Sequence, residues 1–380
     1  MSFSFSQEYG WTDISANIPT EADLSDVFFV SDDEGWISVS SDAIILHTTD
    51  GGASFEIQTT QTSLEAIYMI NQSEGYTGGG SGFVYKTSNG GVNWDFFGSM
   101  ASTLTDMDFA TSTQGYACCD GGAVFSIGGT VNNLNSGQAI PFSGISSSSV
   151  DNVWVCGGSS ILFYNGSTFT FQAGPAGSYN DIFFLNDQEG WVVGNNGLIG
   201  YTVNGGDTWT QQTNPDTNSL YGVFFLTQNI GWAVGSQGTI LYTANGGDTW
   251  TGQGAGHTTA FLRGVHFVST NNGNVGYVVG NGKTLLKYGE VLGIGDAKLP
   301  IEFQLFPIPV KDKLQIKCSD LKTESGIIEI LSLDGKELLK KEIYRGNENN
   351  EIDLSNLEAG MYFCKITIDN KSSTKKLIIE

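Results

Sequence analysis

Seven chemically capable side chains stand just after the start of a segment that recurs along the chain. Together they offer carboxylates, an amide, a phenol and a guanidinium, groups that bind a sugar, a peptide or a cation when they converge on one pocket. The alternative is that the aspartates among them cap backbone amides where a strand begins, as short polar side chains do in turns. The candidate binding residues are Asp26, Glu65, Asp106, Asn180, Asp181, Tyr221 and Arg263.

Catalysis and metal binding are less well supported by the residue types. Residues 1–295 contain 25 Asp and Glu residues, so a carboxylate pair for glycoside hydrolysis could arise by chance; we nevertheless predict no catalytic residue. The five cysteines form no CxxC motif and the three histidines are scattered, so the sequence predicts no metal site and no cofactor. An odd cysteine count leaves at least one thiol outside any internal bridge, and Cys318 with Cys364 is the pair that could form one.

Negative charge is concentrated in the first three quarters of the chain. The formal net charge is -23, and residues 1–295 carry -21 of it with only four basic side chains. Such a surface repels nucleic acid phosphates and anionic lipid headgroups. No apolar run reaches the ~18 residues of a membrane span. We therefore predict no nucleic-acid partner and no membrane span, with a linker over residues 291–300 where the charge balance changes.

The elements that position these residues are short strands in seven repeats. The repeats begin near residues 24, 64, 104, 142, 179, 220 and 262, and Gly, Asn, Asp and Ser clusters divide each into four strands. No window has the 3.6-residue period of an amphipathic helix. Four strands per ~40 residues, repeated around an axis, predict an all-β fold with a seven-bladed β-propeller over residues 8–290. The last repeat lacks a fourth strand, and we expect residues 9–15, with Trp11 at the place of Trp209, to supply it.

Paired apolar residues mark the first strand of several repeats. Phe28 and Phe29 are one such pair, and Phe224 and Phe225 are another. A half-exposed strand would alternate apolar and polar residues instead. We therefore expect both members of each pair to be buried between neighbouring blades.

A recurring octet stands at the turn between the third and fourth strands of four repeats. An Asp or Asn side chain accepts turn N–H bonds there, the following glycine allows a positive φ, and an aromatic residue folds back over the hairpin. These octets resemble the Asp-box motif of bacterial-neuraminidase-type repeats, and we expect them to hold turns without carrying chemistry. The octet residues are Asp50, Asn89, Asn204 and Asn245, followed by Phe55, Trp94, Trp209 and Trp250.

The wider repeat pattern runs Leu-x-Asp-Val-x-Phe, then Gly-Trp-x-Val-Gly, then the octet. It resembles the propellers of photosystem II assembly and stability factors over residues 8–290. The resemblance implies a non-enzymatic binding scaffold that presents a basic patch to its partner, and four basic residues cannot build that patch here. Sialidases share the octet, but their arginine triad cannot form because Arg263 and Arg345 are the two arginines of the chain.

Residues 301–380 form a second segment, which reads as short strands of a small β-sandwich. LFPIPVKDKLQIK (305–317), IIEILSLDGKELLKKEI (327–343) and IDLSNLEAGMYFCKITIDNKSSTKKLIIE (352–380) resemble the motifs of type A C-terminal sorting domains of the type IX secretion system. The resemblance implies that residues 301–380 bind the type IX machinery of a Bacteroidetes-type cell. It also implies a secreted or outer-membrane surface location.

The first residues, MSFSFSQ, look like the end of a signal peptide trimmed from this chain, with a mature start near Gln7. A disordered start explains them equally well. Taken together, the sequence predicts a secreted or cell-surface, non-enzymatic propeller that binds an unknown protein or glycan. The alternative is a polysaccharide-active glycoside hydrolase or a lectin on the same scaffold.

Overall fold

The computed structural model describes residues 9–270, 273–290, 303–306, 309–318, 325–332, 336–344, 349–368 and 371–379. The chain divides into two compact units, one being Tyr9–Glu290 and the other containing the C-terminal strands. The regular structure is nearly all β, as the sequence predicts, apart from the 3-10 turns η1 (Ser15–Asn17), η2 (Gly80–Gly82), η3 (Asn195–Gly197) and η4 (Ser236–Gly238). Within the described ranges, no helix has the length and apolar character needed to cross a membrane.

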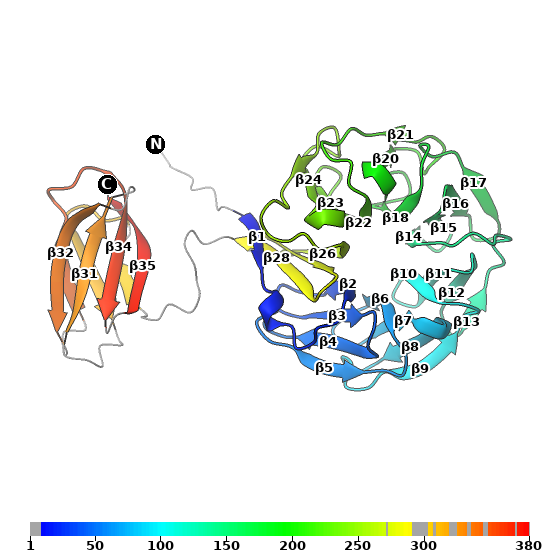
Figure 1. The fold of residues 1–380 in the computed structure, drawn as a ribbon, viewed down its shortest axis with the longest axis horizontal. Helices are drawn as coiled ribbons and strands as arrows, with labels where there is room; N and C mark the ends of the chain where they lie inside the picture. The colour runs from blue at the N-terminus through cyan, green and yellow to red at the C-terminus, as the bar shows by residue number, and fades with distance from the viewer. Residues whose placement is uncertain are drawn as a thin grey trace. The chain divides into compact units, whose positions relative to one another are not determined.

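Seven four-stranded antiparallel sheets stand around a central axis (Figure 1), which confirms the predicted seven-bladed propeller. The chain runs outward through the first six sheets, so β2, β6, β10, β14, β18 and β22 are inner strands. Blade 1 holds β2 (Leu24–Phe29), β3 (Gly35–Val39), β4 (Ile44–Thr48) and β5 (Glu56–Thr59); blade 2 holds β6 (Leu64–Met69), β7 (Gly75–Gly79), β8 (Phe83–Thr87) and β9 (Asp95–Ser99); blade 3 holds β10 (Leu104–Thr111), β11 (Gln114–Cys119), β12 (Val124–Ile127) and β13 (Val131–Asn133).

Blades 4 to 6 repeat the same order. Blade 4 holds β14 (Gly144–Ser149), β15 (Asn152–Gly157), β16 (Ser160–Tyr164) and β17 (Phe169–Gln172); blade 5 holds β18 (Tyr179–Phe184), β19 (Gly190–Gly194), β20 (Ile199–Thr202) and β21 (Thr210–Gln211); blade 6 holds β22 (Leu220–Phe225), β23 (Gly231–Gly235), β24 (Ile240–Thr243) and β25 (Thr251–Gly252).

Blade 7 joins the two ends of the propeller segment. It consists of β26 (Leu262–Thr270), β27 (Gly273–Gly280), β28 (Thr284–Glu290) and, outermost, β1 (Tyr9–Asp13). Trp11 stands opposite Tyr288 in the antiparallel β1–β28 pair, and its ring is 6% exposed. The N-terminal strand therefore completes the last blade, as the sequence predicts.

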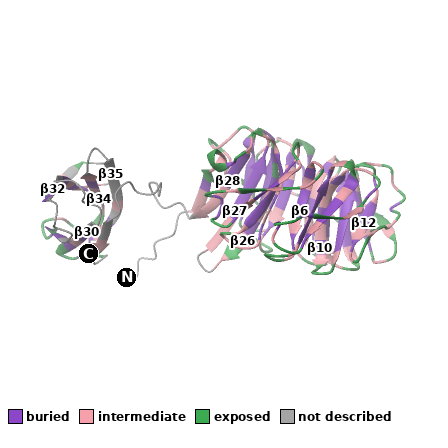
Figure 2. Cartoon of the chain, turned by 90° about the horizontal axis from the view of Figure 1, so that it is seen from below, coloured by how far each residue is buried: buried purple, intermediate pink, exposed green. Residues whose placement is uncertain are grey.

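The blades adhere through stacked aromatic rings, and Figure 2 shows the buried strand residues between exposed loops. Phe225 of blade 6 stacks on Trp191 of blade 5, with 3.5 Å between ring centroids and 9° between planes. A Cβ on Gly231 would lie 2.5 Å from the Phe225 ring. The two residues of the Gly-Trp pair therefore act differently. The glycine leaves space for the phenylalanine ring of its own blade, and the tryptophan packs on the phenylalanine ring of the next blade. The same stacking joins Trp154 to Phe184, Trp232 to Phe267 and Tyr277 to Phe29.

The paired phenylalanines differ from the expectation in one respect. Phe29 and Phe225 are each 1% exposed, but their neighbours Phe28 and Phe224 are only half-buried. The reason is geometric. Phe29 and Phe225 face the preceding blade and are covered by its ring, whereas Phe28 and Phe224 face the central axis, where they are less covered.

The C-terminal unit contains two sheets. One orders β29 (Phe303–Phe306), β30 (Lys313–Cys318) and β33 (Asn349–Asp353); the other orders β32 (Glu337–Tyr344), β31 (Ser325–Leu331), β34 (Gly360–Ile368) and β35 (Lys371–Ile379). Leu314 and Ile316 from the first sheet share one hydrophobic cluster with Ile330 and Ile366 from the second. Both sheets thus contribute to a common core.

Four of the five cysteines are buried free thiols. Cys118 and Cys156 occupy the strand position that Val193 holds in blade 5, and burial raises the pKa of both thiols well above the ordinary value. Cys119 and Cys364 are also free. Cys364 therefore forms no bridge, while the side chain of Cys318 lies outside the described residues. These thiols pack as small apolar groups.

Candidate functional site at the channel mouth

Six of the seven candidate residues line one small pocket where the inner strands begin, and we call this pocket the mouth. The pocket has a volume of about 140 Å³, and its wall also includes the hydroxyl residues Ser25, Thr105 and Ser143. Asn180 does not line it; its amide donates to the Leu220 carbonyl at 2.8 Å and to Asn195 Oδ1 at 3.0 Å. The six that converge are Asp26, Glu65, Asp106, Asp181, Tyr221 and Arg263.

The three aspartates of the mouth bind backbone amides of two blades at once. Asp26 Oδ1 accepts the N–H of the next residue, Val27, at 2.8 Å, and Oδ2 accepts the N–H of Ile67 in blade 2 at 3.0 Å. The bonds from the next blade repeat around the ring: Ile145 donates to Asp106 Oδ2 and Val223 to Asp181 Oδ2, each at 2.8 Å. The capping alternative is therefore what the geometry shows, and the caps also join neighbouring blades.

We call the position of Asp26, Asp106 and Asp181 in their repeats the clamp position. The other blades have a small residue there. Blades 1, 3 and 5 have Asp, whereas blades 2, 4, 6 and 7 have Ala66, Gly144, Gly222 and Gly264. A Cβ on Gly144 would lie 2.8 Å from Asp181 Oδ1, and one on Gly264 would lie 3.2 Å from Asp26 Oδ1. Close to the axis there is little room for a side chain beside each carboxylate, so the blade that precedes each Asp carries Gly or Ala at this position.

The residue before the clamp position, which we call the entry residue, usually also binds the next blade. Four entry residues are small and polar, and each donates to the carbonyl that opens the following inner strand. The bonds are Ser25 to Leu64 (2.8 Å), Thr105 to Phe142 (2.9 Å), Ser143 to Tyr179 (3.2 Å) and Asn180 to Leu220 (2.8 Å). These four side chains therefore join neighbouring blades, and their hydrogen-bond donors are used within the protein.

Three entry residues break this pattern: Glu65 on blade 2, Tyr221 on blade 6 and Arg263 on blade 7. A carboxylate cannot donate to a carbonyl, and none of the three makes the interblade bond within the described part of the chain. Arg263 Nε instead donates to Asn281 Oδ1 at 2.6 Å, and its Nη2 lies 4.0 Å from Oδ2 of Asp23, which directly precedes the first strand of blade 1. Tyr221 lies 6.0 Å from the ring of Phe261, which is 47% exposed. Blades 6, 7, 1 and 2 are consecutive, so the three exceptions share one side of the mouth.

The electrostatics of the mouth follow from burying several carboxyls together. Burial raises the pKa of Asp26 to about 6 and that of Asp181 to about 7. Burial, and then the charges of Asp181 and Asp26, raise the pKa of Asp106 well above its usual range. Burial also raises the pKa of Glu65, an effect that the Arg263 charge opposes. The mouth therefore holds protons at a pH where exposed carboxyls have lost them.

An aromatic collar lies two or three residues further along the inner strands, and it was not among the predicted site residues. The Phe28 ring is 4.6 Å from Tyr68 and 4.3 Å from His266, which is 5.2 Å from Phe224. His266 accepts the Phe29 N–H through Nδ1 at 3.3 Å, and burial lowers its pKa to about 4. The imidazole is therefore neutral near pH 7. The collar residues stand at the same position of each repeat, two residues after the clamp position, and this regularity could have identified them from the sequence.

The octets lie away from the mouth and hold turns. In all four, the Asx Oδ1 accepts the N–H four residues ahead, at 2.9 Å for Asp50 and 3.0 Å for Asn89, Asn204 and Asn245. The Ser54 hydroxyl is the main cause of a lowered pKa at Asp50. Glycines such as Gly247, at φ +93, supply the left-handed backbone that the turn needs.

The octet aromatics differ from the expectation, because they reach the preceding blade. Trp250 Nε1 donates to Gln212 Oε1 at 3.1 Å, and Gln212 Nε2 donates to the Gly246 carbonyl at 2.8 Å. Trp94 and Gln58 form the same clasp at 2.9 Å. Between blades 4 and 5, Gln172 Nε2 donates to the Gly205 carbonyl at 2.7 Å, while Trp209 Nε1 has no partner in the part of the chain that the structure describes. The octet thus locks one blade to the next.

Metal binding has no geometric support in the described ranges, where no three His, Cys, Asp or Glu side chains are grouped to hold an ion. The three entry residues that do not bond to the next inner strand give the mouth one carboxylate, one phenol and one guanidinium, and the guanidinium is paired with Asp23. Whether these residues bind a ligand stays a prediction.

Comparison with known proteins gives two family matches. The profile of the secretion system C-terminal sorting domain matches residues 304–380. The profile of photosynthesis system II assembly factor YCF48 matches residues 5–95 and 207–337. No curated protein matches the sequence. The sorting domain implies export to the cell surface or beyond, and contact with the type IX secretion machinery.

Solved structures share the propeller fold at low sequence identity. YCF48 bound to D1 peptide has a TM-score of 0.60 at 18% identity, covering 76% of this chain and 96% of that one. YCF48 from Cyanidioschyzon merolae has a TM-score of 0.60 at 18% identity, covering 73% and 98%. Virginiamycin B lyase from Staphylococcus aureus has a TM-score of 0.63 at 13% identity, covering 74% and 99%. Because the YCF48 profile matches more than half of its length, the chain belongs to the photosynthesis system II assembly factor YCF48 family, here joined to a type IX secretion sorting domain.

Proposed function

We propose that this protein is a non-enzymatic binding module, exported through the type IX system, that grips a basic peptide segment of a partner at the channel mouth. The observation that carries the proposal is the break in the ring-closing pattern at Glu65, Tyr221 and Arg263. Four small entry residues bind the next blade, whereas these three are larger and project into the same pocket. Positions that depart from a structural rule are expected at functional sites. Glu65 and Tyr221 gain no hydrogen bond from the departure within the described ranges, whereas Arg263 pairs with Asp23 at 4.0 Å.

The charge of the propeller favours a basic partner. Residues 1–295 carry a net charge of -21, and such a field attracts cationic segments over several ångströms and speeds their association. Glu65 supplies a carboxylate inside the mouth, and Tyr221 with the exposed Phe261 supplies ring surface for a cation or an aliphatic stem. A solved YCF48 holds a D1 peptide, which supports a peptide as the kind of ligand.

The state of the mouth carboxyls supports a role without catalysis. Glycoside hydrolysis requires two free carboxyl groups that flank the scissile bond. Asp26, Asp106 and Asp181 each receive a backbone N–H of the next blade, so their positions are set by ring closure. Glu65 is the remaining acid of the pocket, and it faces the Arg263 charge.

The proposal is tested by peptide binding with the full-length protein. A basic peptide selected from a random library should lose about tenfold in affinity on Glu65→Gln and on Tyr221→Ala, because each removes one contact worth about a tenfold change. Affinity should fall as salt rises. Glu74→Gln, the same change at an exposed loop acid that pairs with Lys86 at 3.6 Å, is the matched control.

Two results would contradict the proposal. One is a library that yields no basic peptide, or peptides whose binding is equally weakened by the Glu74 control. The other is turnover of a polysaccharide that a single carboxylate substitution abolishes, which would establish the glycoside hydrolase alternative.

Export is tested separately in the native host. Deleting residues 300–380 removes the whole sorting-domain match, and the truncated propeller should then accumulate in the periplasm. Normal appearance of the truncated protein in the medium or on the cell surface would show that the segment is dispensable for export.

A further inference from the structure

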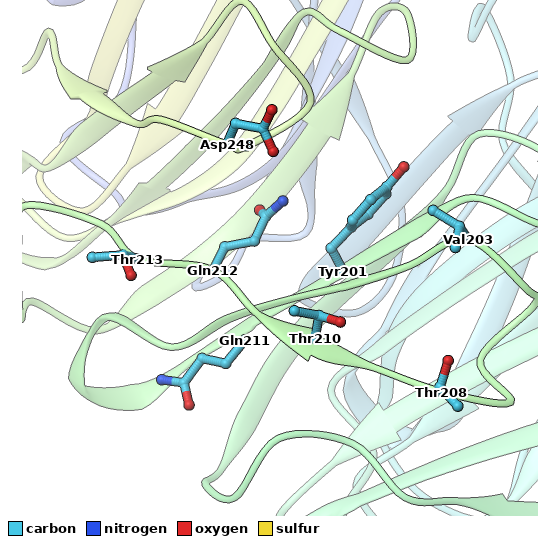
Figure 3. A pocket seen from close by; sticks show the side chains of 9 residues that line it. Tyr201, Val203, Thr208, Thr210, Gln211, Gln212, Thr213 and Asp248 are labelled. Carbon is cyan, nitrogen blue, oxygen red and sulfur yellow. The ribbon is translucent and has the colours of Figure 1, made fainter.

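Two grooves on the outer part of the propeller are lined by equivalent positions of the repeat. One lies between blades 5 and 6 and has a volume of about 370 Å³ (Figure 3); the other lies between blades 1 and 2 and has about 560 Å³. Tyr201, Gln211 and Asp248 of the first groove correspond to His47, Ile57 and Val92 of the second. The hollow is therefore a product of the repeat, and its chemistry differs from one copy to the other.

The groove between blades 5 and 6 has a rigid floor. Gly247 lacks a side chain there, and a Cβ at this position would run into the Gln212 amide. That amide is fixed on both sides, because Trp250 Nε1 donates to it at 3.1 Å and it donates to the Gly246 carbonyl at 2.8 Å. A binding surface whose groups are already held loses little conformational freedom when a ligand arrives.

Tyr201 forms a flat wall of this groove. Its ring stacks on Trp191, with 4.9 Å between centroids and 23° between planes. In the sheet Tyr201 stands between Trp191 on one side and Thr210 of the short edge strand on the other. One ring face is therefore covered by the indole, and the opposite face is turned toward the small threonine and the groove.

Polar groups without internal partners surround this ring face. Asp248 is exposed, and its carboxylate makes no hydrogen bond within the described ranges, nor does the amide of Gln211. Figure 3 shows Asp248, Gln212 and Tyr201 bordering the same space. The lining of the groove includes no lysine, arginine or histidine, so it offers hydrogen bonds and ring surface but no partner for an anion.

We propose that the groove between blades 5 and 6 binds a neutral carbohydrate, with a sugar ring against the free face of Tyr201 and its hydroxyls donating to Asp248. A sugar combines an apolar ring face with hydroxyl donors and acceptors, which matches an aromatic wall beside a carboxylate and an amide. The groove between blades 1 and 2 presents Ile57 and Val92, 53% and 79% exposed, at the corresponding positions. It therefore lacks the carboxylate and the amide at these two positions, and the polar side chains that line it, such as Glu34, His47 and Glu56, stand elsewhere in the groove.

The test is a glycan array with the full-length protein, followed by calorimetry with the oligosaccharides that bind. We expect neutral oligosaccharides to bind and sulfated or sialylated ones to be excluded. Asp248→Asn should weaken binding about tenfold, since it replaces the charged acceptor, and Tyr201→Leu should abolish it. Asp207→Asn is the matched control, because Asp207 holds the same octet position in blade 5 and lies outside the groove.

Three results would overturn the proposal. These are the absence of neutral-glycan binding at millimolar concentrations, a preference for anionic glycans, and equal losses in the Asp248 and Asp207 variants. A loss of glycan binding in Glu65→Gln would place the sugar at the mouth instead. An unchanged melting temperature shows that the Asp248 variant is folded, and this control does not depend on peptide binding. Failure of the glycan proposal therefore leaves the mouth proposal standing, and the reverse also holds.

Discussion

At the scale of single residues, the polar groups near the axis owe their identity to the amides they face. A buried carboxylate is costly unless hydrogen bonds satisfy it, and Asp181 receives the Ile182 and Val223 N–H groups, each at 2.8 Å. The same bonds satisfy backbone groups of two inner strands. An aspartate at the clamp position is thus part of the joint between blades, and it gives the joint a dependence on pH.

We expect the propeller to be more stable at pH 5 than at pH 8. The folded-state pKa of Asp26 is about 6 and that of Asp181 about 7, against an ordinary 3.8. Because the folded state holds these protons more tightly, their contribution is complete below about pH 4 and is lost as pH rises through about 6 to 7. Urea unfolding followed by Trp fluorescence reports on the propeller, since all eight Trp residues lie between positions 11 and 250.

Asp181→Asn should flatten this pH dependence, because the substitution removes one of the titrating groups. Asp207→Asn, the same change at an exposed octet position, should leave the slope unchanged. A stability that rises from pH 5 to pH 8, or equal slopes in the two variants, would refute the assignment.

The octet cap offers a second test at this scale. Asn245 Oδ1 accepts the Thr249 N–H at 3.0 Å and the Thr243 hydroxyl at 2.9 Å. Asn245→Ala should lower the free energy of unfolding by about 1–2 kcal/mol, since buried and turn hydrogen bonds each contribute about 1 kcal/mol. Asp248→Ala in the same octet removes an exposed side chain and should change stability little. An unchanged melting temperature for Asn245→Ala would show that the cap is dispensable.

At the scale of elements, a blade that is followed by an octet is held by the outer turn of the next blade. The Gln–Trp clasp depends on both partners, and the copies show how they match. Where the octet ends in Trp94 or Trp250, the preceding blade supplies Gln58 or Gln212. Where it ends in Phe55, which has no N–H to donate, the contact is apolar and Ile14 of blade 7 packs in the same hydrophobic cluster.

A double-mutant cycle tests this pairing. Gln212→Ile should cost about 2–3 kcal/mol, because it leaves the Trp250 N–H buried without an acceptor. Adding Trp250→Phe to Gln212→Ile should recover part of that loss by recreating the apolar pair found at Ile14 and Phe55. The free energies of unfolding come from urea titration, and strictly additive single losses would mean that the two side chains act independently.

At the scale of the whole molecule, the chain ends close the ring. β1 is the outer strand of blade 7, and Trp11 Nε1 donates to Gln253 Oε1 of blade 6 at 3.1 Å. Closure through chain ends has a cost as well. In other blades the indole of the Gly-Trp pair donates to an octet carbonyl of the next blade, as Trp191 Nε1 does to Gly246 at 3.2 Å. Blade 7 has no hairpin between its third and fourth strands and so no octet, and Trp232 Nε1 has no hydrogen-bond partner among the described residues.

We therefore expect Trp11 to control the integrity of the propeller. Trp11→Ala should cost about 3–5 kcal/mol, as large-to-small changes of buried aromatics do, and should expose the β28 edge to aggregation. Trp11→Phe keeps the ring contacts with Phe267 and Tyr288 and should cost only about 1 kcal/mol for the lost hydrogen bond. Melting curves with light scattering measure both effects. Equal losses in the two variants would point to the N–H rather than to packing.

The sequence by itself determined the repeat, the number of blades, the N-terminal strand of blade 7 and the octet turns. These features depend on the strand pattern and on turn residues within a few positions of one another, such as Asn245 and Thr249, four residues apart. The burial of the adjacent phenylalanines was predicted only in part, because Phe28 and Phe224 face the central axis and are half-buried.

Only the tertiary structure decided which polar residues of the mouth are occupied and which remain for a ligand. Asp26 and Ile67 are 41 residues apart and Asp181 and Val223 are 42, so each bond joins two repeats rather than neighbours in the chain. Ser25 and Thr105 bond to carbonyls of the next blade, whereas Glu65, Tyr221 and Arg263 make no such hydrogen bond within the described ranges. A bond between blades exists only once the ring has closed, so the sequence alone does not separate the two groups.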